Sequence, residues 1–269
     1  GGGILLAAAL GPFPALLALA AVLLIQCLFF ADGGLLAYGC NVFNMGVVSC
    51  LLAYPLIFRP IVKGGLSKKR ITAASVLSVV AGLQAGALCV VLETILSGVT
   101  ELPPGPFLLL MQPIHLAIGV VEGLVTAAVL CYVHSLRPEL LDSSLENTRM
   151  PAKVPMRRIL VSFIVLTVLV GGGLSIFASA YPDGLEWSME GVAGTAELER
   201  EGAVYAAAGA AVEKTAFMPD YAFPGEGEPS AAAEAAGTAA AGLAGSLITV
   251  LAAGGLGLVI GRARKKQAV

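Results

Sequence analysis

The chain has 269 residues, of which 57% are hydrophobic and 13% are charged, with a formal net charge of -2 at pH 7. Because a soluble globular domain carries roughly 25% charged residues, this composition excludes an ordinary soluble protein and predicts a polytopic membrane protein. The charges are segregated by segment, a pattern that sets membrane topology, and nucleic acid is not expected as a partner.

Apolar runs long enough to cross a membrane follow one another along the chain. A spanning helix needs about 20 mostly apolar residues. The first run, residues 2–10, is shorter and ends at the Gly-Pro-Phe-Pro sequence of residues 11–14. Six longer runs predict complete spans at residues 15–30, 35–58, 71–96, 107–136, 159–180 and 237–260. The sequence therefore predicts an all-α, polytopic membrane helix bundle of about six complete transmembrane helices plus a truncated N-terminal one.

Basic residues at alternate span ends predict the topology. The loop 59–70, the segment after residue 136 and the Arg-Ala-Arg-Lys-Lys sequence near the carboxyl end are basic, which assigns them to the cytoplasm by the positive-inside rule. The segments on the other side, including residues 181–237, carry acids and few bases. We therefore expect a multi-pass protein of the cell membrane with a cytoplasmic carboxyl terminus.

His115 and Glu122 are ionisable residues in the interior of the apolar run 107–136. His115 and Glu122 are seven residues apart, which places both on one face of a helix. Ionisable groups at membrane depth mark functional sites by default, so both are candidates to line a polar interior. A structural role, as a hydrogen-bonding group between helices, is the alternative for each. The neighbouring Gly-x-x-x-Gly pattern of Gly119 and Gly123 predicts close helix packing.

The stretch DGGLLAYGCNVFNMG, residues 32–46, places two amides in an otherwise apolar run. Asn41 and Asn44 are three residues apart and project to similar sides of a helix. An unsatisfied amide is costly at membrane depth, so each is expected to hydrogen-bond to a facing helix or to support a ligand-binding histidine.

Three motifs carry a resemblance to a known transporter family. The patterns D-G-G…G-x-N-x-x-N-M-G and H-x-x-I-G-x-x-E-G-x-x-T, the second beginning at His115, resemble CbiM/NikM, the substrate-binding membrane subunit of cobalt/nickel energy-coupling factor (ECF) transporters. Pro-Asp-Gly-Leu-Glu at residues 182–186 is similar to the PDGLE (CbiN/NikN-like) region fused to such subunits. The resemblance implies a membrane core at residues 1–158 and a PDGLE region at 159–269, in which two transmembrane helices flank the extracytoplasmic loop 181–237.

The resemblance implies the substrate-capture component of an ATP-driven cobalt/nickel importer and not an enzyme. Such a component binds Ni(II) or Co(II) as transported substrate near the outer face, holds no permanent cofactor, and lies in membrane lipid. Its partners are a coupling subunit (CbiQ/NikQ-like) and cytoplasmic ATPases (CbiO/NikO-like). Consistent with this dependence, the sequence contains no nucleotide-binding signature of its own.

The family's metal ligands are a Met-His pair at the amino terminus and a histidine that precedes the small-residue run. Because this chain opens with Gly-Gly-Gly, the resemblance implies that the principal ligands lie upstream of Gly1 and are absent here. Asn41, Asn44, His115 and Glu122 are then candidates for the pocket around the ion.

Other functions remain open from the residues alone. An ion-gradient-driven metal permease would use Glu122, but the internal repeats that would support it are not found in the sequence. An intramembrane enzyme would use His115 and Glu122 as acid and base, but no nucleophile pattern accompanies them. Nickel and cobalt are not distinguished, because nitrogen ligands bind both ions.

Overall fold

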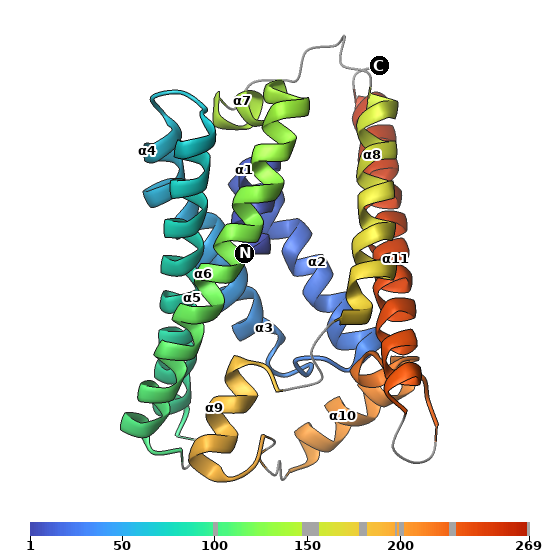
Figure 1. Ribbon diagram of the computed structural model, residues 1–269. Coiled ribbons are helices and arrows are strands. Elements are labelled where there is room, and N and C mark those ends of the chain that lie inside the picture. The colour runs from blue at the N-terminus through green and yellow to red at the C-terminus, as the bar shows by residue number, and fades with distance from the viewer. Residues whose placement is uncertain are drawn as a thin grey trace. The chain divides into compact units, whose positions relative to one another are not determined.

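The computed structural model describes residues 1–98, 102–146, 156–177, 182–196, 198, 202–225 and 230–267. Figure 1 shows its helices, and no β-strand occurs among these residues, so the all-α prediction is confirmed. The chain forms two compact units. Unit 1 comprises Gly1–Ala20, Gly39–Val154 and Tyr181–Glu201, and unit 2 comprises Ala21–Tyr38, Pro155–Ala180 and Gly202–Val269.

Five helical stretches in the described part are long and apolar enough to cross a membrane: Pro12–Phe30, Tyr38–Val62, Lys68–Ser97, Pro104–Leu136 and Ala232–Gly255. They match five of the six expected spans and establish a multi-pass membrane protein. The span expected at residues 159–180 is represented by a shorter apolar helix, Val161–Ile176. Residues 178–181, where its predicted end falls, lie outside the described part.

The amino end consists of two helices separated at one glycine. The helix α1 (Gly2–Leu10) ends at Gly11, which has a φ of 85°, a backbone conformation that favours glycine. The next helix, α2 (Pro12–Phe30), begins directly afterwards. Proline suits the first helical position because the N–H that it lacks would have no partner in the helix. The expected break is therefore confirmed at Gly11, whereas Pro12 and Pro14 belong to the start of α2.

Unit 1 contains most of the remaining amino-terminal half. Its further elements are α3 (Tyr38–Asn41), the π-helical η1 (Val42–Phe58), α4 (Arg59–Val62), α5 (Lys68–Ser97), α6 (Pro104–Leu136), α7 (Pro138–Glu146) and α9 (Gly184–Ala193). The first three follow one another without a break and together make the second span. Ser67 is the N-cap of α5, and its side chain accepts a hydrogen bond from the backbone N–H of Arg70.

The helices α5 and α6 approach each other closely where α6 carries glycine. A Cβ atom at Gly123 would lie 2.8 Å from the Cα atom of Val76, and one at Gly119 would lie 3.1 Å from the Cα atom of Val80. The obstacles are backbone atoms, so they cannot move aside as a side chain can. The Gly-x-x-x-Gly pattern therefore brings these helices together, as its sequence predicted.

The helix α1 is enclosed within unit 1 by small residues. A Cβ atom at Gly3 would lie 2.6 Å from the Cβ atom of Ser49 on η1. Ile4, Ala7 and Ala8 are buried in the same core. The hydroxyl of Ser144 on α7 donates a hydrogen bond to the carbonyl oxygen of Ala7 at 3.3 Å. This short helix is thus part of the interior of unit 1.

Unit 2 pairs two long helical stretches. Its elements after α2 are α8 (Met156–Val168), η2 (Leu169–Gly173), η3 (Leu174–Phe177), α10 (Ala203–Thr215), η4 (Pro219–Tyr221) and α11 (Ala231–Gln267). The stretch from α8 to η3 runs beside α11 (Figure 1). A Cβ atom at Gly242 would lie 2.5 Å from the carbonyl oxygen of Gly171, so glycine again permits the contact.

The carboxyl end of α2 is capped by a segment far along the chain. The last carbonyl groups of a helix have no partner within it. Here the Thr215 hydroxyl donates to the carbonyl oxygen of Leu28 at 2.6 Å, and the Phe217 N–H donates to that of Phe29 at 3.2 Å. The ring of Phe217 also packs on Phe30, with centroids 5.5 Å apart.

A polar triad completes this end of unit 2. The Tyr221 hydroxyl donates to Asp32, and the Gln26 amide donates to both, at 3.0 Å to Tyr221 and 3.3 Å to Asp32. Burial raises the pKa of Tyr221, and its hydrogen bond to Asp32 and the charge of that carboxylate raise it further. Tyr221 therefore stays protonated as the donor. Asp32 of the Asp-Gly-Gly turn thus has a structural partner.

The close contact of α5 and α6 predicts an unequal response to adding one methyl group. Gly123→Ala should destabilise the protein by about 1–3 kcal/mol, because overpacking against backbone forces the helices apart. Gly105→Ala on the same helix meets nothing within 4 Å and should be neutral or slightly stabilising. Thermal unfolding of the detergent-solubilised variants measures the difference. Equal melting temperatures would contradict the packing described here.

Candidate functional site

Asn44 is fixed by a carboxylate on the facing helix. It is a buried residue of η1, and its side-chain nitrogen donates a hydrogen bond to Glu93 Oε2 on α5 at 2.8 Å. Its Oδ1 atom is also buried and accepts no hydrogen bond from the described residues. The backbone carbonyl oxygen of Asn44 would lie 2.9 Å from a Cβ atom at Gly86, so the two helices touch at this point. Asn44 therefore connects η1 to α5, as expected of an amide in the membrane.

A second polar contact links α5 to α6. The Gln84 side chain donates to the Gln112 carbonyl oxygen at 2.8 Å, and the Gln112 side chain donates to the Gln84 carbonyl oxygen at 3.3 Å. Each side-chain nitrogen thus finds a backbone acceptor on the other helix. This reciprocal pair holds the outer-facing half of α6, in the predicted topology, against α5.

His115 is oriented by its own helix. Its Nδ1 atom lies 2.8 Å from the carbonyl oxygen of Met111, one turn earlier on α6. A carbonyl oxygen only accepts hydrogen bonds, so Nδ1 carries the proton in this contact and Nε2 keeps its lone pair in the neutral ring. Nε2 is thus the ring atom left to accept a proton or to coordinate a metal ion.

The Pro-Asp-Gly-Leu-Glu motif starts the helix α9. Asp183 is the N-cap, and its carboxylate accepts hydrogen bonds from the N–H groups of Leu185 and Glu186, both at 2.8 Å. The Glu186 carboxylate accepts from the N–H of Asp183 at 3.1 Å. This reciprocal arrangement is a capping box, which satisfies N–H groups that the helix itself cannot pair. The Asp and Glu of the motif thus define where α9 begins.

The leucine of the motif anchors α9 to the rest of unit 1. Leu185 and two further residues at helical spacing, Met189 and Val192, pack on a buried apolar cluster formed by α5 and α6. The cluster consists of Ala87, Val91, Phe107 and Met111. The apolar stripe of α9 therefore lies on the half of α6 that contains His115.

The glycine of the motif touches His115 directly. A Cβ atom at Gly184 would lie 2.9 Å from Cε1 and 3.3 Å from Nε2 of the His115 ring, and 3.0 Å from Ile118. Gly184 is buried in this contact. The absence of a side chain at Gly184 is what allows the first turn of α9 to cover the free edge of the imidazole.

Glu122 lies two turns further along α6 and contacts the amino end of the chain. Its Oε2 atom accepts from the Gly1 nitrogen, and its side chain is 43% exposed. A Cβ atom at Gly1 would lie 2.7 Å from the hydroxyl oxygen of Thr126, one turn beyond Glu122. The backbone at Gly1 is therefore held against this face of α6.

Three of the four candidates make their polar contacts with other residues. Within the described ranges, no hydrogen bond or ion pair joins Asn44, His115 and Glu122 to one another. Asn41 ends α3, one turn before Asn44. Among the described residues, no group of three or more His, Cys, Asp and Glu side chains is arranged to hold a metal ion.

Comparison with known proteins identifies the family. Residues 1–140 match the family described as the cobalt uptake substrate-specific transmembrane region, CbiM. The chain belongs to the CbiM family. Residues 157–262 match the PDGLE domain, so the helix α9 that lies over His115 comes from the PDGLE part of the chain. Both motif-based assignments are thereby confirmed.

The relatives of this CbiM-family chain are metal transport proteins. A putative fused nickel transport protein NikMN of Archaeoglobus fulgidus is 31% identical over 253 residues, 94% of this chain and 74% of the relative. The fused nickel transport protein NikMN of Rhodobacter capsulatus is 34% identical, over 67% of this chain and 54% of its own length. The cobalt transport protein CbiM of Sorangium cellulosum is 33% identical, over 51% and 61%. No solved structure matches the chain.

These comparisons exclude one of the alternatives. The family and its relatives are transport proteins, so the chain is not an enzyme, and the intramembrane acid–base chemistry considered for His115 and Glu122 is discarded. Glu93, near the end of α5, was not among the candidate residues identified from the sequence. Its partner Asn44 is 49 residues away in the chain, and nothing local in the sequence points to that pairing.

The contact of Gly184 with His115 predicts that an added methyl group displaces α9. Gly184→Ala should shift the emission of Trp187, the single tryptophan of the chain, to longer wavelength, because Trp187 lies on α9. Gly191→Ala is the matched control, since a Cβ there meets only the mobile end of Leu110. Fluorescence spectra of the purified variants report the shift.

A second change separates this contact from general instability. Adding His115→Ala to Gly184→Ala removes the ring and leaves only the flexible end of Ile118 near the new methyl group, so the wild-type emission should largely return. An unchanged spectrum for Gly184→Ala, or equal shifts for the two glycine variants, would show that α9 does not rest on His115.

Proposed function

We propose that this chain is the substrate-capture component of an ATP-driven importer of Ni(II) or Co(II). The observation that carries the proposal is the match to a fused nickel transport protein along 94% of the chain, which includes both the membrane core and the PDGLE part. The chain binds the divalent ion near the outer face of the membrane. The ion is transported substrate, and no permanent cofactor is required.

The proposed site lies along the face of α6 that carries His115 and Glu122. Residues that precede Gly1 in a longer chain would join beside Glu122 and Thr126, because the backbone of Gly1 rests there. If such a segment is present, we assign the principal metal ligands to it. Glu122 then supports them from α6, and Asn41 and Asn44 hold the neighbouring helix in place.

The energy for transport is assigned to partner subunits. The sequence of 269 residues contains no phosphate-binding loop of the Walker type. The chain therefore acts with a membrane coupling subunit and cytoplasmic ATPases of the CbiQ/NikQ and CbiO/NikO kinds. Nickel and cobalt are both retained as substrates, since nitrogen and carboxylate ligands serve either ion.

We also propose that the carboxyl terminus and the loop 63–67 face the cytoplasm. The Arg59 side chain donates a hydrogen bond to the Leu145 carbonyl oxygen at 3.1 Å. The loop 59–70 and the segment after residue 136, which their basic residues assign to the same side of the membrane, are therefore in contact. This contact supports the topology. The helix α9 belongs to the outer side in this arrangement.

The transport proposal predicts dependence on partners. Cells without their own nickel importers should accumulate radioactive nickel when they express this chain in its full-length form together with the coupling subunit and active ATPases. Accumulation should be lost when the ATPases are inactivated. Uptake by the membrane chain alone, driven by an ion gradient, would contradict the proposal and favour the permease.

Within that assay, Glu122→Gln should weaken nickel binding roughly tenfold, the usual scale for a group that supports metal ligands. Glu213→Gln removes an exposed carboxylate of α10 and serves as the control for loss of one negative charge. Equal uptake by both variants at low nickel concentration would show that Glu122 takes no part in the site.

The topology predicts opposite labelling of two introduced cysteines in a cysteine-free background. Glu190→Cys on the exposed side of α9 should react with a membrane-impermeant maleimide added to intact cells, and Lys69→Cys should react only after the membrane is opened. Ser188 is unsuitable because it is fully buried. Labelling of Lys69→Cys in intact cells would overturn the assignment.

A further inference from the structure

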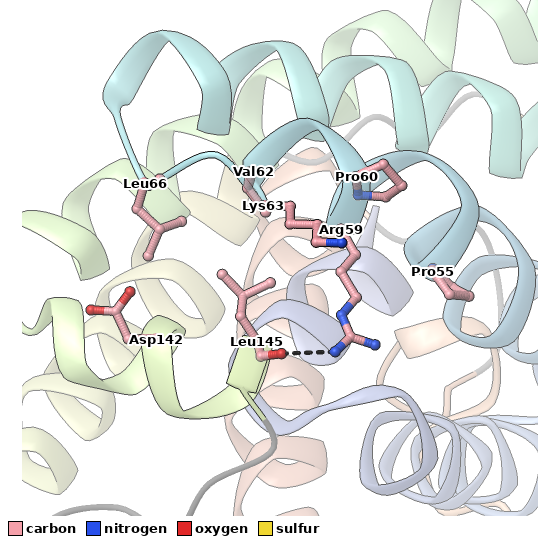
Figure 2. A pocket seen from close by; sticks show the side chains of 9 residues that line it. Pro55, Arg59, Pro60, Val62, Lys63, Leu66, Asp142 and Leu145 are labelled. Carbon is pink, nitrogen blue, oxygen red and sulfur yellow. Dashed lines mark hydrogen bonds between the residues drawn. The ribbon is translucent and has the colours of Figure 1, made fainter.

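A pocket at the end of unit 1 away from α9 has no role in the proposed capture site. Its volume is about 740 Å³, and it lies between α4, the loop leading into α5, and α7. Figure 2 shows Arg59 and Lys63 on the α4 side and Asp142 and Leu145 on the α7 side. The pocket therefore has two cationic side chains along one wall.

The cations of this pocket are available to a ligand. Arg59 uses one N–H group on the Leu145 carbonyl oxygen, at 3.1 Å, which holds the guanidinium at the end of α7 and leaves further donors. Lys63 is exposed, and its backbone N–H donates to the Arg59 carbonyl oxygen at 2.9 Å. Its side-chain ammonium makes no hydrogen bond or ion pair within the described ranges. Asp142 is the acid of the pocket lining, and in Figure 2 its carboxylate lies apart from the guanidinium.

The charge around the pocket is strongly positive. The segment 59–70 contains five Lys and Arg residues and no acid. Three of these cations, Lys68, Lys69 and Arg70, occupy the first turn of α5. Positive charge at a helix N-terminus is unfavourable, because that end carries the positive pole of the helix dipole. A bound anion offsets both contributions.

The pocket also lies at the boundary of the hydrocarbon region. The spans Tyr38–Val62 and Lys68–Ser97 meet at the loop that lines it. Phospholipid phosphates lie at this level of a bilayer, and the apolar residues Pro55 and Leu66 in the lining suit the glycerol and upper acyl chain of a lipid. Basic pockets between helix ends of this kind bind anionic headgroups.

We propose that this pocket binds the phosphate of an anionic phospholipid headgroup, with Lys63 and Arg59 as its cationic partners. The proposal concerns the end of unit 1 remote from α9 and does not depend on the transported ion. It gives the basic loop a binding role in addition to its effect on topology.

Native mass spectrometry of the full chain released from detergent tests the proposal. Dioleoylphosphatidylglycerol should bind more tightly than dioleoylphosphatidylcholine, and Lys63→Gln should weaken the phosphatidylglycerol complex about fivefold. Lys69→Gln is the matched control: it removes another exposed cation, on the first turn of α5, that does not line the pocket, and should change affinity less than twofold. Asp142→Asn should tighten binding, since it removes the acid that repels a phosphate.

Several results would overturn the proposal. Equal weakening by Lys63→Gln and Lys69→Gln would show diffuse attraction and no site. Displacement of the lipid by an equal concentration of inorganic phosphate would identify a soluble anion as the ligand. A purely structural role of these residues would not make Asp142→Asn bind phosphatidylglycerol more tightly. If Asp142→Asn does not tighten phosphatidylglycerol binding and Lys63→Gln does not weaken it, the pocket is excluded as the binding site.

Discussion

Polar groups in the hydrocarbon region must find partners inside the protein, because no water is present to satisfy them. In unit 1 three side-chain amides meet this requirement across helix boundaries: Asn44 donates to Glu93, and the side chains of Gln84 and Gln112 donate to each other's backbone. These contacts are possible because glycines bring the helix backbones close together. The close contacts of α5 with α6 at Gly119 and Gly123, and with η1 at Gly86, are therefore the features on which the arrangement of these polar side chains depends.

Local sequence patterns predicted the parts of this structure that local forces determine. The positions of the spans follow from the lengths of the apolar runs, and the break at Gly11 follows from the helix-breaking Gly-Pro sequence. The close packing of α6 on α5 follows from the spacing of its glycines. Partners distant in the chain could not be predicted in this way. The pairing of Asn44 with Glu93 and the capping of α2 by Thr215 depend on tertiary packing. The span expected at 159–180 is represented among the described residues by the shorter apolar helix Val161–Ile176.

The PDGLE motif can be explained residue by residue. Asp183 and Glu186 close the capping box, Leu185 enters the apolar cluster, and Gly184 permits contact with His115. The motif therefore encodes a helix start that is shaped to fit one histidine of the CbiM region. This fit explains why a sequence signature near residue 184 belongs to the same compact unit as a helix that begins at Pro104. It also supplies a physical route by which the PDGLE part would influence the metal site proposed on α6.

We propose that the ion is captured on the face of α6 that carries His115 and Glu122. Trp187, the single tryptophan, lies on α9 within one turn of the residue that touches His115. Bound Ni(II) or Co(II) quenches nearby tryptophan emission, so fluorescence during titration of the full-length chain measures this proximity. The account predicts saturable quenching that a chelator reverses and that is weaker in Glu122→Gln. Calorimetric binding of the ion with unchanged Trp187 emission would place the site elsewhere and contradict the account.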